Sequence, residues 1–156
     1  MAIIIRDCEI WYPQLVKPNT RFNKENPTFE IQIRTTDKEQ KKEWESLGIK
    51  TTPVDPDEGE LYYKSSIKKR KFTRNGEEST PVKVMDASTN EIDPGIIGNG
   101  SIGNVRIFQY TFPRADGAPG TANILDAIQI TTLKKFERME SEVPEFEDLG
   151  ETTVIE

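Results

Sequence analysis

The sequence concentrates positive charge in residues 64–74, which read KSSIKKRKFTR. This stretch, called the basic strand below, contains no acid and six cations: Lys64, Lys68, Lys69, Arg70, Lys71 and Arg74. In an extended chain Ile67 would mark the buried face, and Lys68, Arg70 and Phe72 would point outward together. Such cations bind phosphates, and an aromatic ring stacks on a nucleobase. The pattern predicts a polyanion-binding surface, although lysines on an edge strand also prevent aggregation.

A second outward row is expected on residues 105–112. Arg106, Phe108, Tyr110 and Phe112 alternate with other residues and would share one strand face. One cation with three aromatic rings is typical of a stacking platform. Phe108 and Phe112 could equally lie in the core, because aromatic side chains are usually buried. Tyr110 is the better candidate for exposure, because its hydroxyl tolerates water.

Two other segments supply candidates. Residues 28–35 alternate between apolar and polar side chains, and Arg34 lies on the polar face, where it could extend the row of cations. Trp11 and Tyr12 could also stack on bases, with the core as the expected place for Trp11.

The C-terminal end of the chain carries the opposite charge. Residues 137–156 hold eight acids and one cation, whereas residues 1–136 hold 19 acids and 20 cations. The excess of acids over cations in the whole chain therefore does not argue against a nucleic-acid partner. We expect this end to imitate DNA, shielding the basic strand until DNA displaces it, and to contact partners through Glu145, Phe146, Glu147, Asp148 and Glu151. A merely solubilising end is the alternative.

Catalytic groups are scarce. The sequence contains no histidine, which removes histidine-dependent triads, general bases and metal ligands. Its one cysteine, Cys8, has no histidine partner and cannot form an intramolecular disulfide. Residues 98–103 match G-x-G-x-x-G, but a strand rather than a helix follows, so we expect a tight turn and no dinucleotide site. A carboxylate-only magnesium site stays open, but we expect a protein that is not an enzyme and has no cofactor.

The segments that must position these side chains are mainly strands. One helix is expected over residues 37–47, with Asp37 as N-cap, Gln40 completing a capping box and Gly48 closing the end. Pro13 is expected to stop the first strand. The expected strands cover residues 2–12, 28–35, 61–73, 81–85, 105–112 and 123–136, and loops are expected over residues 51–60 and 87–103.

Five or six strands with one helix favour an all-β domain with the OB-fold, a five-stranded, partly open barrel. We expect this domain over residues 1–137 and a disordered acidic tail over residues 138–156. No run of about 20 apolar residues is present that could cross a bilayer. A reducing, cytoplasmic setting is the simplest expectation.

Six stretches follow one another along most of the chain: WYPQLVKPNTRFN, FEIQIRT, the basic strand, PVKVMDA, IIGNGSIGNVRIFQYTF and LDAIQITTLKKFE. In this order, before an acidic end, they resemble the single-stranded DNA-binding proteins of short-tailed, podovirus-type bacteriophages. The resemblance implies an OB-fold homodimer in the cytoplasm of the infected bacterial host. It also implies sequence-tolerant binding of single strands in DNA replication and recombination, and contacts of the tail with the phage DNA polymerase and helicase-primase.

These observations together predict the DNA-binding residues Lys64, Lys68, Lys69, Arg70, Lys71, Phe72, Arg74, Arg34, Arg106, Phe108 and Tyr110. Two other functions stay open. One is an acidic interaction module or DNA mimic that inhibits a host enzyme; such a mimic should spread acids over its folded surface, whereas residues 1–136 are slightly basic. The other is a virion assembly protein that uses the basic strand as an interface.

Overall fold

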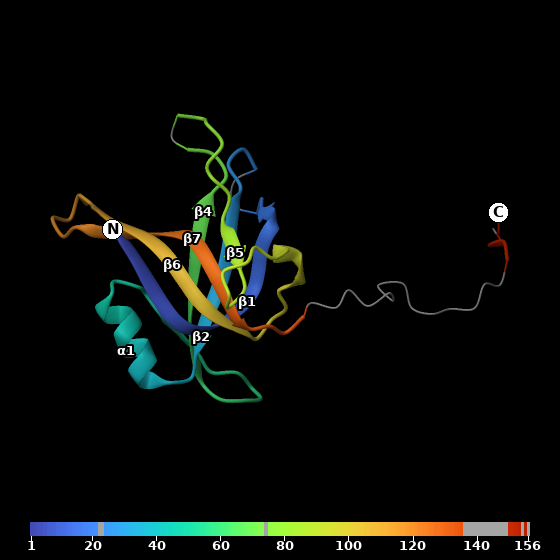
Figure 1. Cartoon of the computed structure of the whole chain (residues 1–156), viewed down its shortest axis with the longest axis horizontal. Coiled ribbons are helices and arrows are strands. Elements are labelled where there is room, and N and C mark those ends of the chain that lie inside the picture. The colour runs from blue at the N-terminus through green and yellow to red at the C-terminus, as the bar shows by residue number, and fades with distance from the viewer. Residues whose placement is uncertain (22–23, 74, 136–149, 154, 156) are drawn as a thin grey trace.

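The computed structural model describes residues 1–21, 24–73, 75–135, 150–153 and 155. The elements in these residues are β1 (Ala2–Asn19), β2 (Thr28–Thr35), α1 (Lys38–Ser46), β3 (Thr52–Val54), β4 (Tyr62–Arg70), β5 (Lys83–Met85), the 3-10 helix η1 (Pro94–Ile96), β6 (Ser101–Phe112) and β7 (Gly120–Thr132) (Figure 1). No helix in this described part is long and apolar enough to cross a membrane.

The strands form a closed barrel. Their order in the sheet is β3-β4-β2-β1-β6-β7-β5, and a parallel pairing of Lys68 with Ile124 joins β4 to β7. Strands β1, β2, β4, β6 and β7 therefore make a five-stranded ring, to which β3 and β5 add short edges. This connectivity is that of the OB-fold, so the predicted fold class is confirmed. The barrel is closed by this pairing, rather than partly open as predicted.

Alternating apolar side chains fill the barrel. Ile31 and Ile33 on β2 and Ile67 on β4 are buried, as the sequence pattern predicts. Each such side chain contributes about 1.5–3 kcal/mol when fully buried. The core consists of Ile5, Cys8, Ile10, Ile31, Ile33, Trp44, Ile49, Ile67, Val84, Ile97, Val105, Ile107, Leu125, Ile128 and Ile130.

Helix α1 begins and ends where predicted. The Asp37 carboxylate accepts a hydrogen bond from the Glu39 backbone N–H at 2.9 Å, and Gly48 adopts φ +87° after the last turn. The predicted capping box is wrong, because Gln40 does not return to Asp37. Its amide instead donates to the backbone carbonyls of β1 at Arg6 and Asp7, at 3.1 and 3.0 Å.

The helix is thereby fixed against β1 and directs Trp44 into the core. The C-terminal end of the helix is bound to the β6–β7 hairpin, because the Asn123 amide donates to the Gly48 carbonyl at 3.1 Å. Helix α1 therefore lies below the hairpin (Figure 1).

Several predicted bounds are wrong. Strand β1 continues through Pro13 to Asn19, because the proline lies in a bulge where no ladder hydrogen bond is needed. The predicted loop at residues 51–60 contains β3, which pairs with the start of β4. The loop at residues 87–103 contains η1 and the first residues of β6. Strand β4 is shorter than predicted and ends at Arg70, and β7 spans Gly120–Thr132.

Candidate nucleic-acid interface

The strand register brings the two predicted rows of side chains together. Phe108 pairs with Ile124, Ile124 pairs with Lys68, and Lys68 pairs with Glu30, so one row crosses β6, β7, β4 and β2. Paired residues point to the same side of a sheet, and their chain neighbours on β4, β6 and β7 are buried, so this row faces outward. Adjacent strands lie about 4.8 Å apart, which places Phe108 and Lys68 about 10 Å apart around the barrel.

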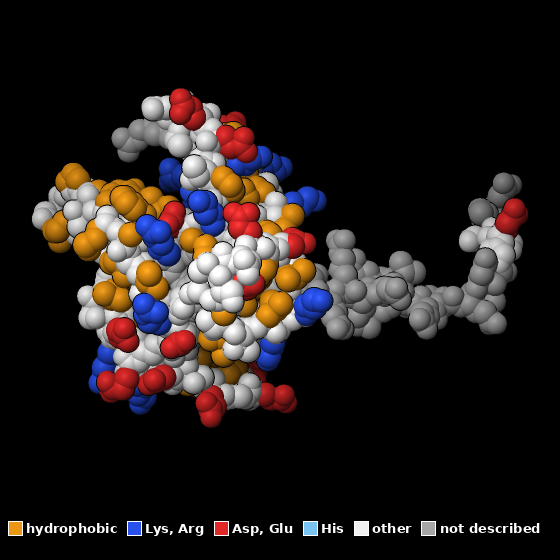
Figure 2. Space-filling model, in the orientation of Figure 1, with side chains coloured by type: hydrophobic (Ala, Val, Ile, Leu, Met, Phe, Trp, Pro, Cys, Tyr) orange, Lys and Arg blue, Asp and Glu red, His pale blue; other side chains and the backbone are white. Residues whose placement is uncertain are grey.

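The aromatic residues of β6 form an exposed stripe. Phe108, Tyr110 and Phe112 are 50%, 48% and 38% exposed, so the core alternative for Phe108 and Phe112 is wrong. The rings of Tyr110 and Phe112 lie 6.4 Å apart, and the Phe112 ring covers Gly120 so closely that no other side chain would fit there. Figure 2 shows hydrophobic side chains over this hairpin and Lys and Arg side chains around the base of the loop after β4.

The cations of the basic strand differ in their partners. Lys68 Nζ lies 3.6 Å from Glu30 Oε2, and the Lys69 ammonium donates to the Thr80 hydroxyl at 2.9 Å. Within the described residues, no carboxylate forms an ion pair with Lys64 or Arg70. These two cations are therefore the best placed to receive a phosphate.

Arg106 is less available than predicted. Its Nε lies 3.2 Å from Asp126 Oδ2, and both side chains are about half exposed. Exposed ion pairs contribute only about 0–1 kcal/mol, so a phosphate can compete for this guanidinium. Lys68 is held more firmly, because the side chain of its partner Glu30 is only 13% exposed.

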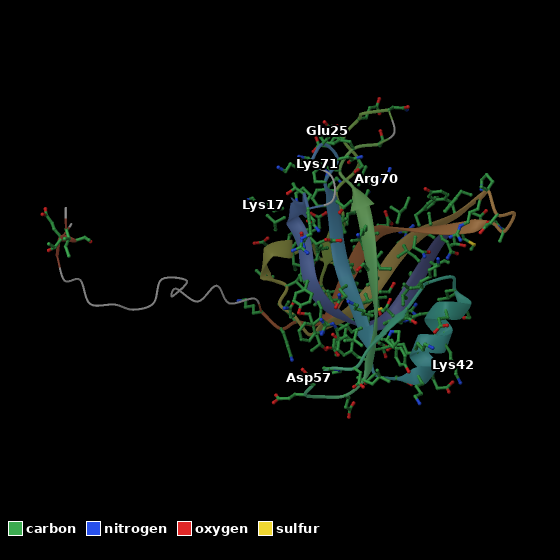
Figure 3. The ribbon with its side chains drawn as sticks, turned by 180° about the vertical axis from the view of Figure 1, so that it is seen from behind. Lys17, Glu25, Lys42, Asp57, Arg70 and Lys71 are labelled. Atoms are coloured by element: carbon green, nitrogen blue, oxygen red, sulfur yellow. The ribbon has the colours of Figure 1, made fainter. Side chains whose placement is uncertain are left out.

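The charged side chains are distributed unevenly along the barrel. Figure 3 shows three cations, Lys17, Arg70 and Lys71, and one acid, Glu25, at one end, with Lys42 and Asp57 at the other. The second end carries α1 and the loop around β3; residues 37–60 contain eight acids and four cations. The field at the first end therefore favours an anionic ligand.

An aromatic cluster surrounds Arg34 on the outer face of β1, β2 and β4. The Arg34 guanidinium carbon lies 4.0 Å from the Trp11 ring centroid, 4.5 Å from that of Tyr62 and 5.3 Å from that of Tyr12. Its Nε donates to Gln32 Oε1 at 2.6 Å. Each cation–π contact is worth about 0.5–2 kcal/mol. Arg34 thus holds these rings in place, and its guanidinium is largely committed to them.

Tyr62 was not predicted as a site residue, although its spacing from Lys64 indicates that role. It precedes Lys64 by two residues and so shares the outward face of β4. No such signal shows that Trp11 and Tyr12 both contact Arg34, because neighbours in a regular strand point to opposite sides. The left-handed backbone of Tyr12, with φ +48°, breaks this alternation.

The end of the basic strand is held by the loop between β1 and β2. The Asn26 side chain accepts from the Phe72 N–H at 3.0 Å and donates to the Phe72 carbonyl at 3.1 Å. The Lys71 N–H donates to the Pro27 carbonyl at 2.9 Å. Phe72 is half-buried, with the Lys71 ammonium 5.5 Å from its ring. These hydrogen bonds join the segment before β2 to the segment after β4.

Arg74 and the tail residues Glu145, Phe146, Glu147 and Asp148 lie outside the described residues, as does most of the predicted tail. Glu151 is described and exposed.

Cys8 is unsuited to act as a nucleophile. Burial in the core raises the pKa of its thiol far above the usual range, and the nearby carboxylates of Asp7 and Glu43 raise it further. Among the described residues, no group of three or more acidic or cysteine side chains is placed to share a metal ion.

Gly98 and Gly100 lie in the turn that leads into β6, as predicted, whereas Gly103 lies within β6 itself. Gly100 adopts φ +90° and its N–H donates to the Ile10 carbonyl at 2.8 Å. Gly103 lies so close to β7 that a Cβ would come within 2.5 Å of the Gln129 carbonyl oxygen. The strand that follows is incompatible with a dinucleotide site.

Comparison with solved structures identifies the same architecture in phage proteins. One is gp2.5, a single-stranded DNA-binding protein encoded by bacteriophage T7, with a TM-score of 0.58 and 13% identity over 89% of this chain and 96% of that chain. Another is the single-stranded DNA-binding protein from bacteriophage Enc34 in complex with single-stranded DNA, with a TM-score of 0.55 and 18% identity over 85% and 87%. The chain has the OB-fold of these proteins. No protein-family model and no curated protein matches the sequence.

The OB-fold also indicates where a ligand would lie. In this fold the face of the second and third barrel strands, with the first and last hairpin loops, binds oligonucleotides and oligosaccharides. Here those strands are β2 and β4, and the loops are residues 20–27 and 113–119. The basic strand lies at the centre of this face, with the Arg34 cluster on one side and the β6 stripe on the other.

Proposed function

We propose that the protein binds single-stranded DNA across β2 and β4 and is not an enzyme. The observation that carries this proposal is the outward row that joins the aromatic stripe of β6, through Ile124, to Lys68 in the basic strand. The two phage proteins with the same fold are single-stranded DNA-binding proteins, and one was solved with its DNA. Both facts support a nucleic-acid ligand for this face.

The cations would bind the phosphates. Lys64 and Arg70 have no ion-pair partner in the described residues. The Lys68 ammonium is paired with Glu30, but it has three N–H donors and could bind a phosphate beside that carboxylate. Lys69 lies within β4, Lys71 directly follows it, and Arg106 lies on β6. Arg74 would add a further cation. Each phosphate contact makes binding to single strands weaker in salt, with a slope of about −0.7 in log K against log salt.

The aromatic rings would receive the bases. Phe108 and Tyr110 form one platform and Trp11, Tyr12 and Tyr62 another, with Phe72 at the loop end. Stacking contributes about 1–3 kcal/mol per base and tolerates any sequence, because every base has a π-face. Paired bases in a duplex cannot offer those faces, so this surface should select single strands. Arg34 contributes chiefly by fixing the second platform.

We also propose the biological setting that the resemblance implies. The protein would act as a homodimer in phage DNA replication and recombination, in the cytoplasm of the infected host. Its acidic tail would compete with DNA for the basic strand and contact the phage DNA polymerase and helicase-primase. The supporting fact is the charge pattern, with eight acids in residues 137–156 against a cationic face on the barrel.

The two tryptophans allow a direct test. Trp44 is buried, whereas Trp11 lies half-buried in the Arg34 cluster, so base stacking should quench the fluorescence of Trp11. We expect oligo-dT to quench fluorescence and a duplex of equal length to bind at least tenfold more weakly. Trp11→Phe should abolish the quenching and retain the signal of Trp44. Equal binding of duplex and single strand would contradict the proposed function.

A further inference from the structure

A groove with a volume of about 550 Å³ lies beside the Arg34 cluster, between the second half of β1 and η1. Beyond Ile10, strand β1 pairs with β2 alone, because its pairing with β6 ends there. The other edge of β1 therefore faces the groove. The apolar part of the lining is Pro13, Leu15, Val16, Pro18, Pro94 and Ile97, and the polar part includes Lys17 and Asn99.

Tyr12 belongs to both the groove and the Arg34 cluster. Its side chain lines the groove, is 54% exposed, and places its ring 5.9 Å from that of Trp11. A left-handed backbone is unusual for a tyrosine and is found where a site constrains it. Here the constraint is visible: the Tyr12 N–H donates to Asn99 Oδ1 at 2.6 Å, within the bulge between Trp11 and Gln14. The bulge thus directs Tyr12 to the mouth of the groove.

We propose that the groove receives one nucleobase of a single strand bound on β1, β2 and β4. This inference rests on the proposed function and adds a second kind of base contact to it, insertion rather than surface stacking. Apolar walls suit the faces of a base, and the Asn99 amide with the exposed edge of β1 offers hydrogen-bonding groups to its rim. The volume lies in the range of small-molecule sites. Lys17, at the end of the barrel shared with Arg70 (Figure 3), would meet the adjoining phosphate.

The first test measures protection of the groove wall. Val16 lines the groove and is 66% exposed, and the native Cys8 is buried, so Val16→Cys introduces one reactive thiol. Its alkylation by iodoacetamide is timed with and without saturating oligo-dT, with binding followed by fluorescence anisotropy in the same samples. We expect at least fivefold protection. Ser46→Cys, exposed at the end of α1, is the control and should react equally fast in both states.

The second test fills the groove. A Cβ on Gly95 would lie 3.5 Å from Val16 Cγ2 and 3.2 Å from Asp93 Oδ1, so Gly95→Leu projects a side chain toward Val16. We expect the affinity for oligo-dT to fall about tenfold, the equivalent of losing one stacked base at about 1.4 kcal/mol. Gly95→Ala needs only a small shift of Asp93 and is the matched control, with affinity near that of the wild type. Circular dichroism establishes that each variant is folded.

The outcomes separate the two proposals. Unprotected Val16→Cys in a sample that is saturated with DNA, or a folded Gly95→Leu variant with wild-type affinity, would overturn the groove proposal and leave the proposed function intact. Failure of the wild-type protein to bind oligo-dT would overturn both.

Discussion

Removing Lys64 and Arg70, which form no ion pair with any carboxylate in the described part of the chain, should change the salt dependence of DNA binding by a calculable amount. If Lys64, Lys68, Arg70 and Lys71 each neutralise one phosphate, log K against log salt should have a slope of about −2.8. The double variant Lys64→Ala/Arg70→Ala should then show a slope of about −1.4. Between 50 and 200 mM salt, the wild type would lose about 50-fold in affinity and the variant only about sevenfold.

The assay is fluorescence anisotropy of a labelled oligo-dT, titrated with protein at four or five salt concentrations. Neither substitution should impair folding, because Arg70 is exposed and Lys64 is paired across the sheet with another cation, Arg34. Thermal melts of both proteins verify this. The variant is expected to bind more weakly at low salt and to approach the wild type as salt increases.

A matched control distinguishes local from total charge. Lys38→Ala/Lys42→Ala removes the same net charge from α1, at the opposite end of the barrel from Arg70 (Figure 3). Its slope should equal that of the wild type. If both double variants lower the slope equally, or if neither does, the assignment of phosphate contacts to β4 is refuted.

Three further predictions follow from the same site. Arg34→Lys keeps the charge but loses the planar group that stacks on the rings, so oligo-dT affinity should fall about fivefold with an unchanged salt slope in anisotropy titrations; a smaller slope would mean that Arg34 binds a phosphate instead. Asn26→Ala removes both hydrogen bonds to the Phe72 backbone and should lower the free energy of unfolding by about 1–3 kcal/mol in urea; an unchanged denaturation midpoint would contradict this. Deleting residues 144–156, which include five acids, should tighten DNA binding at low salt and have no effect near 1 M salt, where charges are screened; unchanged or weaker affinity would remove the competitor role of the tail.

The fold was predictable wherever local patterns were strict. Residues 28–34 alternate between polar and apolar without exception, and both bounds of β2, Thr28–Thr35, match the prediction. The N-cap at Asp37 and the glycine at Gly48 likewise fix the helix. Pro13 misled the prediction because a proline ends a strand only where its missing N–H is needed, and the bulge at this point removes that need. Bulges depend on partner strands and are not encoded in any local pattern.

The candidate site was predictable strand by strand but not as an assembly. A period of two placed Lys68 and Phe108 on the outward faces of their strands. Their proximity depends on the parallel pairing of β4 with β7, which joins residues 56 positions apart in the sequence. The role of Arg34 could not be predicted either, because three rings from β1 and β4 converge on it only in the folded barrel.

The barrel closes where Lys68 meets Ile124, whereas β2 and β4 are held by eight consecutive pairs. This closure is therefore the seam at which the ring of strands would separate most readily in a local opening. A DNA strand lying from Phe108 to Lys68 would span that seam and be bound to both of its sides. Bound DNA would then slow hydrogen exchange at the amides of β7 near Ile124 more than at those of β2. The ligand would thus stabilise the β4–β7 closure of the barrel that binds it.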